Sequence, residues 1–120
     1  MDLKEIMQEN IFVVIGDTTN KEKYACKIKE GLIEHGYKVY AVGKELSSIN
    51  EIPEDIDIVD LCINPIRGLE LMKESKKQCK CVVIQPGAES EALLEYLEQN
   101  RIPYIQGCLL VGLRLYTKAE

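Results

Sequence analysis

Short runs of apolar residues recur along the chain and are separated by longer amphipathic stretches. The clearest runs are apolar throughout and do not alternate with polar residues, which is typical of strands buried on both faces of a parallel sheet. A terminal fifth strand is shorter. Strands are therefore predicted at residues 11–15, 38–42, within 56–63, at 81–84 and at 103–105.

The stretches between these strands show helical spacing of apolar residues. The first predicted helix ends before Gly36, a residue that commonly terminates helices. Its predicted core-facing side carries Tyr24, Ala25, Ile28, Leu32 and Ile33. Helices are predicted at residues 21–35, 66–77 and 90–100.

Two segments are less clearly patterned. Residues 1–10 are polar and mixed, so they indicate either a short leading helix or an extended arm. The apolar tail, residues 108–116, fits either a last helical turn or an extra strand.

The alternation of strands and helices predicts an α/β fold. We expect a Rossmann-like, doubly wound, mainly parallel five-stranded sheet with helices on both faces. The length of 120 residues suits a single domain spanning residues 1–120, and 46% apolar residues can fill its core.

Composition narrows the classes of partner and compartment. The net charge is −5 and no basic stripe is present, which argues against nucleic-acid binding. The apolar runs are too short to span a membrane, and the first residues do not form a secretory signal. Five cysteines without a CxxC pair, together with one histidine, indicate free thiols in a cytoplasmic protein and no metal site.

The fold class predicts where a ligand would bind before any motif is considered. In open α/β sheets, ligands lie beyond the carboxyl ends of the strands, near the point where the strand order reverses. The candidate segments are residues 16–20, 43–46, 64–67, 85–88 and 106–108.

The first segment, Gly16-Asp17-Thr18-Thr19-Asn20, joins a buried strand to a helix. Gly16 allows a tight turn, and the helix N-terminus that follows suits a phosphate group. The same small polar residues could instead serve only as helix caps. The segment is neither a GxGxxG fingerprint nor a P-loop, and Asp17 opposes an anion unless its carboxylate points away.

The second segment bears on the identity of the ligand. Gly43 is followed by Lys44, a cation that fits a phosphate on the ribose and so favours CoA or NADP. Glu45 keeps NAD open, because NAD-binding folds place an acid near the ribose hydroxyls. Both charges could also be ordinary exposed loop residues.

Few residues suggest catalysis, and no catalytic residue is predicted. Cys108 lies at the expected ligand edge and could be a nucleophile or a redox thiol, but no histidine partner is in sight. His35 is predicted at the opposite end of the sheet. Asp57 and Asp60 could form a carboxylate pair. The remaining thiols are interpreted as small core residues or as incidental; these are Cys26, Cys62, Cys79 and Cys81.

Several stretches together resemble a known family. They are residues 13–16, 32–42, 52–53, 56–60, 64–65, 83–88 and 107–108, of which Gln85-Pro86-Gly87-Ala88 with the downstream Cys108 is the most specific. In order and spacing the chain is similar to the small CoA-binding-domain proteins, which look like the N-terminal domain of the succinyl-CoA synthetase α subunit.

The resemblance implies a Rossmann-like fold that binds coenzyme A or an acyl-CoA as a small, non-catalytic nucleotide-binding module. It implies that the phosphates and adenosine lie at residues 16–20 and near Lys44, with residues 64–65 and 85–87 along the same edge. The predicted cofactor-binding residues are Gly16, Asp17, Thr18, Thr19, Asn20, Tyr24, Gly43, Lys44, Asn64, Pro65, Ile66, Gln85, Pro86, Gly87 and Cys108.

Three alternatives stay open. The chain could be an NAD(P)-binding oxidoreductase or a redox-sensing subunit, or, more remotely, a flavin-binding domain. It could also be a degenerate Rossmann domain that binds only protein, with residues 109–115 as a contact for a homodimer or another partner.

Overall fold

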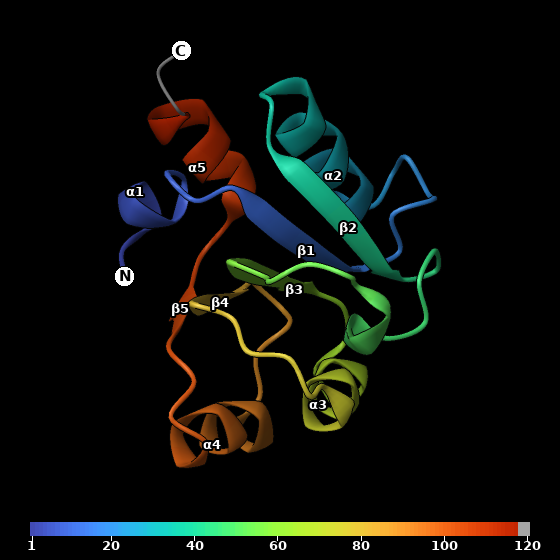
Figure 1. Ribbon diagram of the computed structural model, residues 1–120, viewed down its shortest axis with the longest axis vertical. Helices are drawn as coiled ribbons and strands as arrows, with labels where there is room; N and C mark the ends of the chain where they lie inside the picture. Colours follow the sequence, from blue (N-terminus) through green and yellow to red (C-terminus); the bar gives the residue numbers. More distant parts are fainter. Residues whose placement is uncertain (118–120) are drawn as a thin grey trace.

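Five parallel strands form the centre of the fold, with helices on both faces (Figure 1). The computed structural model of the chain describes residues 1–117. The strand order is β2-β1-β3-β4-β5 and all four pairings are parallel, which confirms the predicted α/β, Rossmann-like fold. The strands are β1 (Ile11–Gly16), β2 (Lys38–Gly43), β3 (Ile58–Cys62), β4 (Cys81–Ile84) and β5 (Tyr104–Gln106).

The helices form two layers. One layer consists of α1 (Leu3–Ile6), α2 (Tyr24–Glu34) and α5 (Leu109–Tyr116), and the other consists of α3 (Pro65–Glu74) and α4 (Glu91–Gln99). A short 3₁₀ turn, η1 (Ile49–Glu51), lies between β2 and β3.

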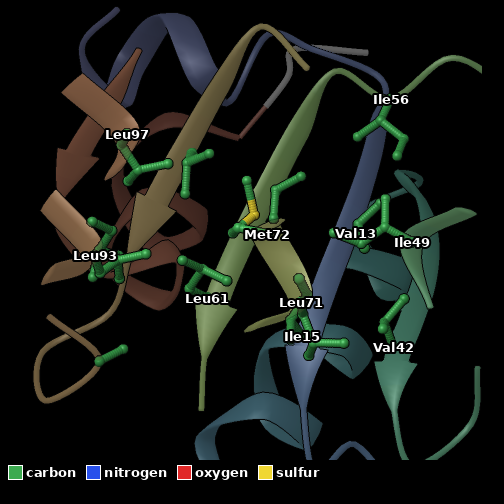
Figure 2. Packing of buried hydrophobic residues seen from close by; sticks show 14 of the residues in the cluster. Val13, Ile15, Val42, Ile49, Ile56, Leu61, Leu71, Met72, Leu93 and Leu97 are labelled. Carbon is green, nitrogen blue, oxygen red and sulfur yellow. The ribbon is translucent and has the colours of Figure 1, made fainter. Parts of the chain in front are cut away.

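Each strand supplies apolar side chains to both layers, which explains why the strands are continuous apolar runs. In β1, Val13 and Ile15 face the α3–α4 layer, while Phe12 and Val14 face the α1–α2–α5 layer. Figure 2 shows the α3–α4 side of the sheet, where strand residues pack against side chains of α3 and α4 such as Leu71 and Leu97.

The helix α2 begins at Tyr24, three residues later than predicted, because residues 21–23 form a turn in which the Lys23 amide donates to the Asn20 carbonyl. Two residues predicted on its core-facing side are instead exposed: Tyr24 by 62% and Ile33 by 53%. Both lie at the margin of the apolar stripe, and the buried face consists of Ala25, Cys26, Ile28 and Leu32.

The helix α3 also differs from its prediction. It begins at Pro65 and ends at Glu74, where Ser75 turns to extended backbone. The predicted end at Lys77 is wrong because the ammonium group of Lys77 donates to the carbonyls of Ile52 and Glu54, which holds this segment against the loop before β3.

The two ambiguous segments are both helical and pack together. An Asp2 capping box starts α1, and the apolar tail forms α5 beside α1 and α2. Leu109 and Leu113 of the tail are buried inside the chain, while Leu115 is 56% exposed. No helix within residues 1–117 is both long and apolar enough to cross a membrane.

Candidate functional site

The strand order reverses between β1 and β3, which is where α/β folds of this order bind ligands at the carboxyl edge. A pocket of about 340 Å³ opens at that edge, within the size range of ligand sites. We call it the outer pocket. Its lining residues come from the segments after β1, β3 and β4 and from the start of α2: Asp17, Lys23, Tyr24, Ala25, Cys62, Ile63, Asn64, Gln85, Pro86, Gly87 and Ala88.

A second, mainly apolar hollow of about 180 Å³ adjoins the outer pocket. This inner pocket is lined by Cys108 together with four residues that also line the outer pocket: Tyr24, Cys62, Gln85 and Pro86. Because the two pockets share these residues, they form one continuous cleft, and Cys108 lies at its inner part.

Gly16 brings the first loop close to the neighbouring strand. A Cβ atom at this position would lie 2.3 Å from the carbonyl oxygen of Cys62 and 2.9 Å from the Cβ atom of Ala25. Only glycine therefore lets β1, β3 and the start of α2 approach this closely. This approach places the N-terminus of α2 beside the ends of the two strands.

The loop after Gly16 is held by its own side chains. The Asp17 carboxylate accepts hydrogen bonds from the amide and hydroxyl of Thr19, at 3.1 and 2.8 Å, and from the amide of Asn20 at 3.3 Å. These bonds, chiefly the one from the Thr19 hydroxyl, lower the pKa of Asp17, and the charge of Lys44 adds to the effect. Asp17 is thus ionised at neutral pH, with its charge partly compensated within the loop.

Thr18 points away from the pocket. Its side chain is 3% exposed, and its hydroxyl donates to the Glu45 carboxylate at 2.6 Å. Glu45 also forms an ion pair with Lys29 at 2.7 Å. The hydrogen bonds from Lys29 and Thr18 lower the pKa of Glu45, so this carboxylate is charged and already paired.

The first turn of α2 offers unpaired donors. Its N-cap, Lys23, makes no side-chain capping bond. Within residues 1–117 the backbone amides of Tyr24, Ala25 and Cys26 have no hydrogen-bond acceptor, and the first two of these residues line the outer pocket. Amides at a helix N-terminus carry partial positive charge and attract anions.

The segment after β3 contributes Ile63 and Asn64 to the lining of the outer pocket. Asn64 caps α3, because its side-chain oxygen accepts from the Arg67 amide at 2.9 Å, and Pro65 occupies the first helical turn. Ile66 is 77% exposed and does not line either pocket.

Gln85 is the polar side chain between the two pockets and is 4% exposed. Its Oε1 accepts from the Leu109 amide at 2.9 Å, and its Nε2 donates to the Sγ atom of Cys108 at 3.2 Å. Because Oε1 must face a backbone amide, the orientation of the side-chain amide is defined.

Cys62 differs from its sequence-based interpretation as a core residue, because it is only partly buried and lines both pockets. The pKa of its thiol is raised to about 12, chiefly by burial. The feature of the sequence that could have identified Cys62 as a site residue is its position at the carboxyl end of β3, where ligands are expected. Asp57 and Asp60, considered above as a possible carboxylate pair, do not lie at the site, because Asp57 accepts from the Asn10 and Ile11 amides and Asp60 is fully buried.

Two larger hollows, of about 560 and 420 Å³, lie at the opposite edge around residues 75–80. Two of the lysines there are structural: Lys77 binds backbone carbonyls, and Lys80 pairs with Glu9 at 2.5 Å. His35 also lies at a helix end away from the cleft, where its Nδ1 bonds to the Gly31 carbonyl at 2.8 Å. Residues 1–117 contain no group of three or more potential metal ligands.

The structure thus brings seven predicted site residues together along the cleft: Asp17, Tyr24, Asn64, Gln85, Pro86, Gly87 and Cys108. The other predicted residues lie outside its lining: Gly16, Thr18, Thr19, Asn20, Gly43, Lys44, Pro65 and Ile66. Sequence reasoning missed four lining residues, Lys23, Ala25, Cys62 and Ile63, and placed a fifth, Ala88, in a candidate segment without naming it as cofactor-binding.

Comparisons with known proteins bear on the family and the fold of the chain. A family model described as a CoA binding domain matches residues 10–114. A conserved hypothetical protein from Pyrococcus furiosus is 29% identical, with a TM-score of 0.74 over 86% of this chain and 97% of that one. No curated protein matches the chain.

Two further solved structures show the fold alone. A hypothetical protein from Pyrococcus horikoshii OT3 is 23% identical, with a TM-score of 0.85 over 96% of this chain and 89% of that one. A protein from Thermus thermophilus is 21% identical, with a TM-score of 0.79 over 95% of this chain and 98% of that one.

Proposed function

This chain belongs to the CoA binding domain family, and from that membership we propose that it binds coenzyme A or an acyl-CoA as a non-catalytic module. The observation that carries the proposal is the continuous cleft at the point where the strand order reverses. Its outer part is lined by loops and a helix N-terminus, and its inner part is smaller and mainly apolar.

The two parts of the cleft suit the two ends of coenzyme A. The nucleotide end is broad and carries phosphates, whereas the pantetheine end is thin, largely apolar and ends in a thiol. The free amides of Tyr24 and Ala25 and the ammonium group of Lys23 favour phosphates in the outer pocket. The inner pocket, at about 180 Å³, is suited to the pantetheine arm.

The charge of Asp17 opposes an anion in the outer pocket, but three hydrogen bonds from its own loop offset part of that charge. Lys44 is exposed and lies near enough to Asp17 to lower its pKa. We propose that Lys44 attracts the 3′-phosphate of the ribose, a group that CoA carries and NAD lacks.

The state of Glu45 favours CoA over NAD. An acid after the second strand binds the ribose hydroxyls in NAD-binding folds. In this chain Glu45 accepts from Thr18 and pairs with Lys29, so binding a ribose would require breaking existing contacts.

The lining residues also support a binding role without catalysis. The titratable side chains of the cleft are Asp17, Lys23, Tyr24, Cys62 and Cys108. His35 is bonded to a backbone carbonyl at a distant helix end, so neither thiol has the imidazole partner that usually activates a cysteine nucleophile.

Calorimetry under reducing conditions tests the proposal, with CoA, acetyl-CoA, 3′-dephospho-CoA, NAD and NADP as ligands. We expect CoA or acetyl-CoA to bind most tightly. Lys44→Glu should weaken CoA binding about tenfold, or about 1.4 kcal/mol, and should have little effect on 3′-dephospho-CoA.

Lys76→Glu is the matched control, because Lys76 is an exposed lysine at the opposite edge of the sheet. It should leave CoA binding unchanged. Absence of heat with both CoA and acetyl-CoA would overturn the proposal, and tighter binding of NAD or NADP would replace it with the oxidoreductase alternative.

A further inference from the structure

The inner pocket contains two thiols in different chemical settings. Cys62 ends β3 and Cys108 immediately precedes α5, and both line the same hollow of about 180 Å³. Both are partly buried and neither forms a disulfide. Cys62 also lines the outer pocket, whereas Cys108 lines the inner pocket alone.

Cys108 has a buried donor directed at its sulfur. The Nε2 atom of Gln85 donates to the Sγ atom of Cys108 at 3.2 Å, while the Leu109 amide holds the other end of the same side chain. Cys108 is also the N-cap of α5, yet its sulfur makes no capping bond to the helix. A hydrogen-bond donor and a helix N-terminus both stabilise negative charge that develops on a sulfur atom during exchange.

Cys62 has the opposite setting. Burial is the main cause that raises the pKa of its thiol to about 12. Cys62 therefore stays protonated at neutral pH. The thiolate is the attacking form in thiol–disulfide exchange, so Cys62 is a poor nucleophile.

From these contacts we propose that Cys108 is a covalent capture site, at which the protein takes up CoA as a mixed disulfide by exchange with CoA disulfide. The Cys108 thiol loses its proton and its sulfur attacks one sulfur of CoA disulfide. The bond between the two CoA sulfur atoms breaks, and a bond between Cys108 and one CoA forms. The other CoA leaves as a thiolate and takes up the proton, so one disulfide is consumed and one is formed.

This inference rests on the proposed function, because the CoA site has to bring the pantetheine sulfur to Cys108. It also predicts that the mixed disulfide persists. To release the CoA by forming an internal disulfide, Cys62 would have to attack the sulfur of Cys108 in the mixed disulfide. Cys62 is protonated at neutral pH, and the sulfur of Cys108 is in contact with the buried side chain of Gln85. An added small thiol should release the CoA instead.

Intact-protein mass spectrometry of the reduced protein mixed with CoA disulfide tests the proposal. We expect one adduct per chain, with the mass of CoA less two hydrogen atoms, that is removed by a reductant. The adduct should form at least about tenfold faster than the one from glutathione disulfide, because the CoA site aligns the reacting sulfur atoms.

Three variants assign the adduct. Cys108→Ser and Cys108→Ala should abolish it. Cys79→Ser, at a partly buried thiol away from the cleft, should retain it. Thermal unfolding of each variant identifies any that fail to fold, and two replacements of Cys108 guard against one being misfolded.

Reversible binding of reduced CoA to Cys108→Ser, measured by calorimetry, separates this proposal from the proposed function. If CoA binds reversibly and the wild-type protein forms no adduct, the capture proposal is overturned and the binding function stands. If CoA does not bind and both disulfides react at the same rate, Cys108 is only an accessible thiol and both proposals fail. An adduct that persists in both Cys108 variants would also overturn the assignment.

Discussion

The buried hydroxyl of Thr18 donates a 2.6 Å hydrogen bond to the carboxylate of Glu45, and this contact joins the first ligand loop to the loop after β2. Lys29 of α2 completes the group through its ion pair with Glu45. Three segments that surround the site are therefore linked by one carboxylate. The same contact removes Thr18 and Glu45 from the residues available to a ligand.

Replacing Thr18 tests this link. Thr18→Val keeps the shape of the side chain but leaves the Glu45 carboxylate with Lys29 alone, so we expect a loss of about 1 kcal/mol in the free energy of unfolding. The pKa of Glu45 should rise towards its ordinary value, because the Thr18 bond helps to lower it. Urea denaturation and an NMR titration of the Glu45 carboxyl measure the two effects. Thr18→Ser, which retains the hydroxyl, should keep the pKa of Glu45 at its wild-type value.

The pH dependence of this group follows from the direction of the shift. The pKa of Glu45 is lower in the folded chain than its ordinary value of 4.5. Its contribution to stability is therefore present above pH 4.5 and is lost as the pH falls through the folded-state pKa. Thr18→Val should reduce that loss, and an unchanged acid limb of the stability curve would contradict the assignment.

Gly16 is the position at which the backbone of the site tolerates no side chain. A Cβ atom there would meet the carbonyl oxygen of Cys62 at 2.3 Å, and backbone cannot move aside as a flexible side chain can. Gly16→Ala should therefore destabilise the fold by about 3 kcal/mol, through separation of β1 from β3. Urea denaturation measures this change.

The control for steric contact is Gly36, which has φ +85° and where an added Cβ atom would have no neighbour within 4 Å. Gly36→Ala should cost only about 1–2 kcal/mol, the cost of the left-handed backbone conformation. Equal losses for the two variants would mean that backbone conformation, and not the close approach to Cys62, makes Gly16 necessary.

Much of the fold was predictable because strands buried on both faces are apolar at nearly every position, as in residues 11–15 and 81–84. The start of α2 was less predictable. The helix was predicted to begin at Lys21, but the hydrogen bond from the Lys23 amide to the Asn20 carbonyl forms a turn, so the helix begins at Tyr24. This turn leaves Tyr24 exposed at the rim of the cleft and not in the core.

The site was only partly predictable for a related reason. The rule that ligands lie beyond strand ends locates the loops, but it does not say which way each side chain points. Thr18 turns inward to Glu45, whereas Gln85 turns towards Cys108. These orientations depend on hydrogen bonds between residues 23 to 27 positions apart, which a local sequence pattern does not contain.

The burial of Asp60 was equally difficult to predict, because an acid within an apolar strand is usually exposed or paired. In the sheet Asp60 lies between Val14 and Val83, fully buried, and neither carboxyl oxygen has a hydrogen-bond partner within residues 1–117. Burial without a partner raises the pKa of Asp60 well above its ordinary value of 3.8. The folded chain therefore favours the protonated acid.

The sign of the resulting pH dependence is opposite to that of Glu45. From about pH 4 upward the unfolded chain loses the Asp60 proton while the folded chain keeps it, so the wild-type protein should lose stability as the pH rises. Asp60→Val, which matches both neighbouring valines, should remove this loss and be more stable than wild type by roughly 1–3 kcal/mol near pH 8, with a smaller difference near pH 4. Urea denaturation across this range measures the difference between the two proteins. Asp55→Val, at an exposed acid in the loop before β3, should stay within about 0.5 kcal/mol of wild type at both ends of the range. A stability difference for Asp60→Val that does not grow with pH would show that Asp60 is paired in the folded chain.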